Sequence, residues 1–360
     1  MKTILIVRLS AIGDIVMASP VAAALKAQHP NCRVLWLTQP ECASLVQDNP
    51  NIDEVISWPR AQWQQLWRER KWRRLYRSVR EFSQMLKAKN IDTAIDLQGL
   101  LKSGILTWLS GAEHKIGLGS KEGSQLLMDQ VIDRGLGDAD LIGSEYRWLC
   151  QQVGAPTEPW TMQIGASDQA IANADALLET LDSDRYIAIC PFTTRPQKHW
   201  HDAGWRALIP KLSTQLNTLD DNIADQLPIV MLGGPGDSKH AQHLAKHHSV
   251  FNWVGKTRLP EAAHIISKAS AVVGVDTGLT HMGHAYNIPT VALFGSTRPY
   301  LKTDTDNGKV IYLNKHCAPC KRKPTCDDRF HCLNDIAPDF IIQQLKALLD
   351  QPIDIRLHTS

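Results

Sequence analysis

Short apolar runs alternate with longer amphipathic stretches along this chain, the pattern of a protein built from alternating strands and helices. The runs expected to form strands are Thr3–Val7, Arg33–Thr38, Thr93–Leu97, Tyr186–Cys190, Ile229–Leu232, Ala271–Val275 and Thr290–Phe294. Several lack the two-residue alternation of a half-exposed strand, as parallel strands covered on both faces do. Helical spacing falls between them, at Val21–Gln28, Val79–Lys89, Trp205–Leu216, Pro260–Lys268 and Phe340–Leu349. The pattern predicts an α/β protein with doubly wound parallel sheets and right-handed crossovers.

The length of 360 residues favours two domains over one, at roughly 150 residues per domain. The stretch Gly154–Asp168 carries two prolines and two glycines with little periodicity, which is typical of a hinge. We therefore expect one domain over residues 1–165 and a second over 166–360, with the final helix free to pack back on the first. Two such sheets would face a central cleft, with ligands bound at the carboxyl ends of the strands.

Composition narrows the class of protein. The hydrophobic share of 43% and the charged share of 21% exclude a disordered chain, a collagen-like repeat and a small disulfide scaffold. No run approaches the ~20 apolar residues that span a bilayer. The apolar N-terminus meets Arg8 too early for a signal peptide, and no small-residue cleavage site follows. We expect a cytoplasmic protein.

The net charge of +2 points to no particular partner, but one segment is strongly basic. Between Arg60 and Arg80, eight basic residues face a single acid, Glu69. The basic residues are Arg60, Arg68, Arg70, Lys71, Arg73, Arg74, Arg77 and Arg80, and Trp63, Trp67, Trp72 and Tyr76 are interleaved with them. The segment could face anionic lipid, an acidic substrate or nucleic acid. Alternatively it is a solvated helix whose aromatic side chains pack inward, since Trp72, Leu75, Tyr76, Val79 and Phe82 follow helical spacing.

The eight cysteines form two groups. Cys32, Cys42, Cys150 and Cys190 are scattered among apolar neighbours, as small buried side chains are. Cys317, Cys320, Cys326 and Cys332 form a C-x2-C-x5-C-x5-C cluster, flanked by His316 and His331. Its spacing is not a standard zinc pattern. A structural zinc site, reduced structural thiols and a redox-labile disulfide all remain open for this cluster.

Two motifs each follow a predicted strand, one near the start of the chain and one near its middle. R-L-S-A-I-G-D at Arg8–Asp14 comes after the first strand, where Gly13 permits a close backbone approach and Asp14 supplies a carboxylate. Position alone favours the simpler role of Asp14 as a helix cap. T-T-R-P-Q-K-H-W at Thr193–Trp200 offers two hydroxyls and Lys198 to phosphate oxygens. The alternative is a turn held by threonine hydroxyls, with the lysine in solvent.

A third motif gives the stronger signal. D-T-G-L-T-H at Asp276–His281 joins a predicted strand to a short helix, whose free backbone amides favour an anion. Gly278 permits close approach of a phosphate and His281 can donate a hydrogen bond. Capping of the helix by Asp276 or Thr277 is compatible with that role. The chain has no G-x-S-x-G or H-E-x-x-H motif, and Asp138-Ala139-Asp140 is interpreted as a solvated turn instead of a metal-binding D-x-D.

These three motifs, together with I-D-L-Q-G-L-L-K-S at Ile95–Ser103, resemble the signatures of glycosyltransferase family 9. That family includes the lipopolysaccharide heptosyltransferases, and the Thr193–Trp200 run is most similar to heptosyltransferase I. The likeness extends in matching order over most of the chain. The segment Cys317–Cys332 departs from the heptosyltransferase I pattern and resembles other members of the family, so a family 9 transferase with another acceptor or donor sugar stays open as an alternative.

The resemblance implies a GT-B fold, with an acceptor-binding first domain and a second domain for the nucleotide sugar. It implies inverting, metal-independent transfer of heptose from ADP-heptose to Kdo in the lipopolysaccharide inner core, without a cofactor. Asp14 would be the catalytic base. Residues implied at the donor are Thr193, Thr194, Lys198, Asp276, Thr277, Gly278 and His281, and those at the acceptor are Ser10, Gly13, Arg60, Gln98 and Lys102.

The implied partners are the nucleotide sugar and a lipid-linked, Kdo-containing acceptor, with peripheral contact at the cytoplasmic face of the inner membrane and no nucleic acid. Two alternatives belong to other classes. One is a sugar-nucleotide epimerase on the same fold, against which the Thr193–Trp200 and Asp276–His281 motifs argue. The other is a non-enzymatic, metal-bound interaction protein organised around the cysteine cluster.

Overall fold

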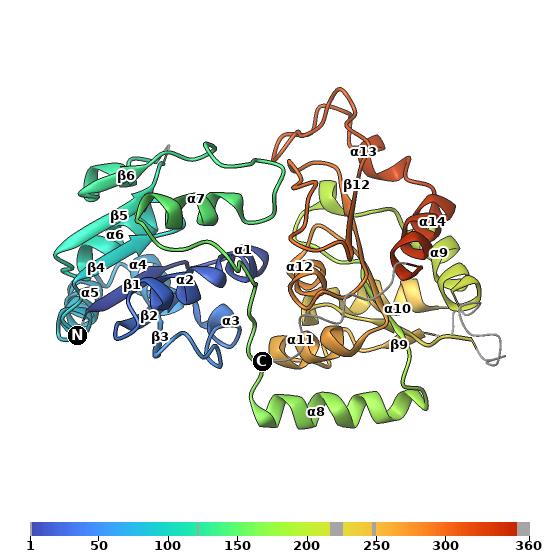
Figure 1. Cartoon of the computed structure of the whole chain (residues 1–360), viewed down its shortest axis with the longest axis horizontal. Coiled ribbons are helices and arrows are strands. Elements are labelled where there is room, and N and C mark those ends of the chain that lie inside the picture. The colour runs from blue at the N-terminus through green and yellow to red at the C-terminus, as the bar shows by residue number, and fades with distance from the viewer. Residues whose placement is uncertain (1, 121, 217–225, 247–249, 351–360) are drawn as a thin grey trace. The chain divides into compact units, whose positions relative to one another are not determined.

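The computed structural model describes residues 2–120, 122–216, 226–246 and 250–350. The chain divides into two compact units, the first comprising Met1–Ala139 and Gly143–Ala166 and the second comprising Asp140–Ile142 and Ser167–Ser360. The short segment joins the second unit because Leu141 forms a parallel bridge with Lys302. Each unit contains a parallel sheet with helices on both faces, as Figure 1 shows.

The first unit is built on a six-stranded parallel sheet in the order β3-β2-β1-β4-β5-β6. Its strands are β1 (Thr3–Val7), β2 (Arg33–Thr38), β3 (Glu54–Ser57), β4 (Thr93–Asp96), β5 (His114–Leu118) and β6 (Gln130–Ile132). The chain reverses its direction across the sheet between β1 and β4, where Val7 pairs with Asp96. Loops leaving the carboxyl ends of these two strands therefore diverge and leave room for a ligand.

Helices cover both faces of this sheet, and the central strands β1 and β4 are buried along their whole length. They are α1 (Ile12–Ala18), α2 (Pro20–Gln28), α3 (Pro40–Ala43), α4 (Arg60–Arg68), α5 (Trp72–Lys87), α6 (Leu101–Leu109) and α7 (Ser144–Gln152). Leu5 and Val7 of β1 share a buried cluster with Phe82 and Leu86 of α5 and with Leu106 of α6. This packing fixes the base of α5 against the sheet.

The second unit repeats the architecture with the order β12-β11-β10-β7-β8-β9. Its strands are β7 (Ile187–Cys190), β8 (Ile229–Met231), β9 (Val250–Asn252), β10 (Ala271–Val275), β11 (Thr290–Phe294) and β12 (Gly308–Tyr312). The reversal falls between β7 and β10, where Gly274 pairs with Cys190. The motifs Thr193–Trp200 and Asp276–His281 leave these two neighbouring strands at the same edge.

The helices of the second unit are α8 (Asp168–Leu178), α9 (Asp202–Gln215), α10 (Ser238–Ala245), α11 (Leu259–Lys268), α12 (Gly278–Ala285), α13 (His331–Asn334) and α14 (Pro338–Leu349). Leu208 and Leu212 of α9 and Leu345 of α14 share one buried cluster with Val273 of β10. Helix α14 packs on α9, β11 and β12. No helix in the described part of the chain has the length and apolar character needed to cross a bilayer.

The predicted α/β class is confirmed, and each expected strand is present to within one residue at either end. Helix α5 spans Trp72–Lys87 and so begins earlier than the expected helical stretch Val79–Lys89. Of the two interpretations of the basic segment, the one with aromatic side chains packed inward is wrong at Trp72 and Tyr76, which are 49% and 69% exposed. The sheet ends before it can cover the first turns of this helix, so only Phe82, Ser83 and Leu86 are buried.

Candidate active site

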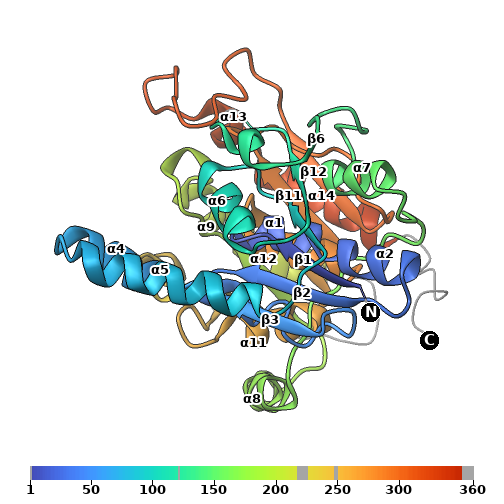
Figure 2. The ribbon, with the colours of Figure 1, turned by 90° about the vertical axis from the view of Figure 1, so that its left-hand side faces the viewer.

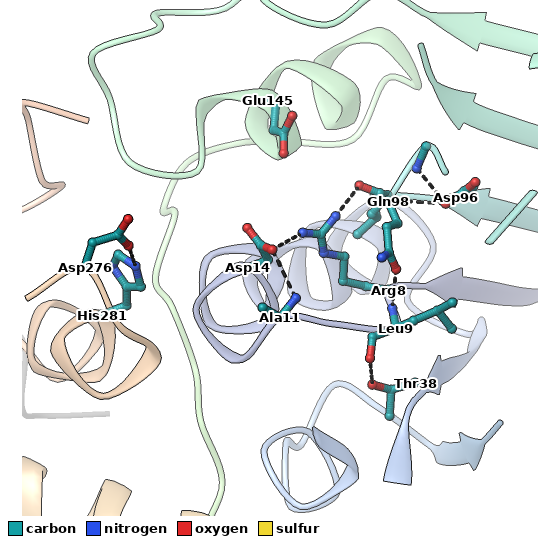
Figure 3. A network of polar contacts seen from close by, with 12 residues as sticks. Arg8, Leu9, Ala11, Asp14, Thr38, Asp96, Gln98, Glu145, Asp276 and His281 are labelled. Atoms are coloured by element: carbon teal, nitrogen blue, oxygen red, sulfur yellow. Dashed lines mark hydrogen bonds and ion pairs between the residues drawn. The ribbon is translucent and has the colours of Figure 1, made fainter. Parts of the chain in front are cut away.

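The first half of the candidate site is the turn from β1 into α1, drawn in Figure 3. The buried Arg8 side chain places Nη2 2.6 Å from Oδ2 of Asp14. The same Oδ2 accepts the backbone N–H of Ala11 at 3.0 Å. Burial opposes the charge of Arg8, but Asp14 beside it, together with Tyr146 and Glu145, outweighs burial and raises the pKa of Arg8 above its usual value. The arginine therefore stays charged and holds one oxygen of Asp14 in place.

The other oxygen of Asp14 is available for chemistry. The side chain is 39% exposed, and no hydrogen bond or ion pair among the described residues uses its Oδ1. Asp14 lies inside the first turn of α1, and its bond to Ala11 closes that turn. The capping role favoured by its position is thus present. It occupies Oδ2 alone, so capping and proton abstraction do not exclude each other.

The loop after β4 is tied to the same turn. Oε1 of Gln98 accepts the backbone N–H of Leu9 at 3.0 Å, and the buried Asp96 carboxylate accepts the N–H of Gln98 at 2.9 Å. Burial raises the pKa of Asp96. Ser10 lies in the β1–α1 turn, and Gly13 lies in the first turn of α1. Three of the residues implied at the acceptor, Ser10, Gly13 and Gln98, are therefore brought together with Asp14.

Two further cations stand at this end of the sheet. Partial burial, followed by the positive charge of Arg60, lowers the pKa of Lys102 on α6. Arg8 adds to that effect. Nη1 of Arg60 lies 3.4 Å from Oε1 of Gln39, which follows β2. Lys102 and Arg60 thus place two positive charges at this end of the sheet, partly offset by Glu122, where an anionic ligand would be favoured.

In the second unit, the side chain of Asp276 is the centre of a polar network. Nζ of Lys198 lies 2.6 Å from its Oδ2, and Nε2 of His281 lies 3.5 Å from its Oδ1. The Thr193 hydroxyl and the Lys198 ammonium also donate to the Asp276 backbone carbonyl, at 3.2 and 3.3 Å. Burial opposes the charge of Asp276, but His281 and Lys198 hold its pKa well below the usual range. The network therefore keeps the Asp276 carboxylate charged in a largely buried place.

Helix α12 begins at this network. Thr277 is its N-cap, in an extended conformation and without a side-chain cap bond, and Gly278 is its first residue. The free backbone amides and the partial positive charge at the start of α12 thus lie next to Asp276. His281 is fixed in its first turn, because its Nδ1 lies 2.7 Å from the Tyr300 hydroxyl.

The remaining donor residue expected from the sequence, Thr194, is exposed. Together with Thr193 it lines a pocket of about 430 Å³ that also touches His240, Phe330 and Asn334. All seven residues implied at the donor therefore lie at or next to the carboxyl ends of β7 and β10.

Sequence reasoning missed two members of the second network. The Thr297 hydroxyl donates to Oδ2 of Asp276 at 2.5 Å, and Tyr300 orients His281. Both follow β11, the strand beside β10, so the rule that ligand-binding loops leave neighbouring parallel strands could have found them. Arg8 belonged to a recognised motif, but nothing in the sequence assigned it as the partner of Asp14.

The structure gives no support to a zinc site at the cysteine cluster. All eight cysteines are free thiols. Burial, and then the neighbouring Cys317, Cys320 and Cys326, raise the pKa of Cys332 to about 11, so the four side chains lie near one another. Yet nowhere in the described ranges are three or more His, Cys, Asp or Glu side chains placed to hold a metal ion.

Two doubly wound parallel sheets, each with polar side chains gathered where its strand order reverses, are the architecture of the GT-B fold, which glycosyltransferases share with some sugar-nucleotide epimerases. The model of one family, glycosyltransferase family 9 (heptosyltransferase), matches residues 79–331. Lipopolysaccharide heptosyltransferase 1 of Pseudomonas aeruginosa is 27% identical, over 98% of this chain and 99% of that protein. Lipopolysaccharide heptosyltransferase 2 of Salmonella typhimurium is 26% identical, over 97% and 99%.

Among solved structures, the E. coli heptosyltransferase WaaC with ADP-2-deoxy-2-fluoro heptose is similar in fold, with a TM-score of 0.69 at 23% identity. The match covers 96% of this chain and 99% of that one. The protein belongs to glycosyltransferase family 9, since the family model covers more than half of its length. It is an enzyme, and the family resemblance and GT-B fold predicted from its motifs are confirmed.

Proposed function

We propose that this enzyme transfers L-glycero-D-manno-heptose from ADP-heptose to a Kdo residue of the lipopolysaccharide inner core, in the cytoplasm. The names of its relatives support heptose as the donor sugar, and the likeness of Thr193–Trp200 to heptosyltransferase I supports Kdo as the acceptor. The observation that carries the mechanism is the Asp14 carboxylate, whose Oδ2 is held by Arg8 and Ala11 while its Oδ1 stays available.

Asp14 acts as the general base in a single displacement. The acceptor hydroxyl oxygen bonds to the anomeric carbon of the heptose as the bond from that carbon to the ADP β-phosphate oxygen breaks. The hydroxyl proton passes to Oδ1 of Asp14. Because the nucleophile enters on the face opposite the leaving group, the configuration at the anomeric carbon inverts. Arg8 is a positioning residue in this step, since it touches Asp14 and not the reacting atoms.

The second unit stabilises the departing ADP. Negative charge grows on the phosphate as the bond breaks, and Lys198, the start of α12 and His281 supply fixed positive potential for it. Asp276 holds Lys198 in position through an ion pair at 2.6 Å and lies where the resemblance implies contact with the heptose. Preorganised donors of this kind need no reorientation during the reaction.

The acceptor is anionic, and the first unit is suited to it. Kdo carries a carboxylate, which Arg60 and Lys102 would attract at the carboxyl ends of the strands. The same two side chains lie on different elements, α4 and α6, so they could contact an acceptor from two sides. Gln98 is fixed by its bond to Leu9 and offers its amide N–H groups to the sugar hydroxyls.

We propose that the transfer needs no metal ion. The reason is that Lys198 and the start of α12 provide the positive charge that a divalent cation supplies in metal-dependent transferases. Asp138-Ala139-Asp140, the D-x-D interpreted above as a solvated turn, is tied into the backbone, where the Asp140 carbonyl accepts the N–H of Leu301 and of Lys302 at 2.7 and 2.8 Å.

An assay with two acceptors tests the proposal. The purified enzyme and ADP-heptose are incubated either with heptose-free Kdo-lipid A or with the same acceptor already carrying one heptose, and products are weighed by mass spectrometry. Gain of one heptose on the first acceptor is expected. The likeness of Cys317–Cys332 to other family members favours the second acceptor as the alternative, and transfer to it alone would reassign the enzyme. Interconversion of the free nucleotide sugar without transfer would instead indicate an epimerase.

A further inference from the structure

Helices α4 and α5 form a hairpin that projects from the first unit beyond the β1–β3 part of its sheet, as Figure 2 shows. The base of the hairpin is anchored, because Trp63 packs edge to face against Trp58 and Phe82 at centroid distances of 6.0 and 5.6 Å. Toward the tip, Trp67 and Trp72 pack against each other at 4.7 Å. The hairpin is thus a formed element, although its outer part has no core beneath it.

Three large aromatic side chains are exposed on this outer part. Trp67 is 63% exposed, Trp72 49% and Tyr76 69%, and no residue from 60 to 80 is buried. Scattered apolar side chains on a surface need no explanation, but three amphipathic rings gathered at one tip mark an interaction site.

The charges are arranged beside the rings. Trp72 and Tyr76 are four residues apart and so share one face of α5, and Arg73, Arg77 and Arg80 form the adjacent row. Among the described residues of the hairpin, Lys71 forms an ion pair with Glu69. The seven basic residues from Arg68 to Arg80 against Glu69 therefore leave an excess of positive charge on the outer part of the hairpin, whereas Arg60 lies at its base beside Gln39.

We propose that the tip of the α4–α5 hairpin docks on a bilayer containing anionic phospholipid. Trp67, Trp72 and Tyr76 would lie at the headgroup level, where amphipathic rings are stable, and the arginines would contact lipid phosphates. A nucleic acid fits less well, because the edge-to-face packing of Trp67 on Trp72 covers a ring face that base stacking would use. The surface is separate from Asp14 and does not depend on the proposed reaction.

Cosedimentation of the full chain with vesicles tests this proposal, without donor or acceptor. Vesicles of phosphatidylcholine with about one third phosphatidylglycerol are compared with pure phosphatidylcholine, at low and high salt. Each arginine near an anionic surface contributes ~1 kcal/mol, or about fivefold in affinity. The triple variant R73Q/R77Q/R80Q should therefore bind the anionic vesicles about 100-fold more weakly. The triple variant W67S/W72S/Y76S should weaken vesicle binding even at high salt, where charge is screened.

The matched control is K239Q/K268Q/K309Q, which removes the same charge from exposed positions of the second unit and should leave vesicle binding unchanged. Thermal melts check that every variant is folded. Equal binding to neutral vesicles, or equal loss in the control variant, would overturn the proposal. The proposal would also be overturned if the protein did not bind vesicles but bound duplex DNA or RNA in an arginine-dependent way. Loss of heptosyl transfer with intact vesicle binding would count against the proposed function alone.

Discussion

The Asp14→Asn variant distinguishes the proposed role of Asp14 as a general base from its structural role in the β1–α1 turn. Asparagine keeps the shape of the side chain and one acceptor oxygen, but it removes the proton acceptor and the charge that faces Arg8. Loss of a positioned general base lowers turnover by about 10²–10⁴, which is ~3–5 kcal/mol in the activation barrier. ADP-heptose affinity should change little, because the residues proposed to bind the donor lie on the second unit.

The same change has a smaller effect on folding. A hydrogen bond to a charged group contributes ~1.5–3 kcal/mol, and the partial exposure of Asp14 places this loss near ~1–2 kcal/mol. That corresponds to about 2–8 °C in Tm for a domain of this size. The enzyme therefore stays folded at 25 °C, and the fall in turnover can be measured on native protein.

Asp53→Asn is the matched control. Asp53 is 40% exposed, pairs with Lys26 at 2.7 Å and accepts the backbone N–H of Val34 at 2.7 Å, so it has nearly the same exposure as Asp14 and likewise one cation and one backbone partner. It should lose a similar amount of stability with unchanged turnover. Steady-state kinetics and thermal melts on both variants decide the question. Near-normal turnover in Asp14→Asn would refute the base and leave Asp14 a structural residue.

Three further outcomes are expected. Lys198→Ala should weaken ADP-heptose binding about 10- to 150-fold by calorimetry, since a charge-assisted hydrogen bond contributes ~1.5–3 kcal/mol, whereas the exposed Lys256→Ala should bind normally. Because the pKa of Asp276 is lowered in the folded state, its carboxylate stabilises the fold fully above the unfolded carboxyl pKa of about 4, and this effect is lost as pH falls below that value. The difference in unfolding free energy between the wild type and Asp276→Asn, measured by urea titration, should therefore be constant between pH 6 and 8 and shrink at lower pH. Saturating EDTA should leave the transfer rate intact, while loss of activity restored by Mg²⁺ or Mn²⁺ would contradict metal independence and loss restored only by zinc would implicate the cysteine cluster.

The central strands could be predicted because burial on both faces requires continuous apolar runs. Thr3–Val7 and Ala271–Val275 match the structure at both ends. Strands nearer the sheet edges were not predicted, since they are partly solvated. In β5, His114 is exposed, and in β12 only Ile311 is buried. A strand of this kind has too few apolar positions to differ from a loop.

Helical spacing alone could not establish which face of α5 is covered. Trp72, Tyr76 and Phe82 all fit the period of one apolar stripe, but a stripe becomes core only where another element meets it. In the structure, Phe82 meets the sheet and the first two turns do not. The sequence likewise brought Asp276 and His281 to one strand end, while the contact of Thr297 with Asp276 depends on how β11 lies beside β10.

The configuration of the transferred sugar tests the account most directly. The purified enzyme is supplied with ADP-heptose and heptose-free Kdo-lipid A in EDTA, and the anomeric configuration of the new linkage is determined by NMR. A single heptose on Kdo, inverted relative to the donor and formed at a rate that Asp14→Asn lowers by at least about 100-fold, is the predicted result. Retention of configuration, or undiminished transfer by Asp14→Asn, would contradict single displacement with Asp14 as the base.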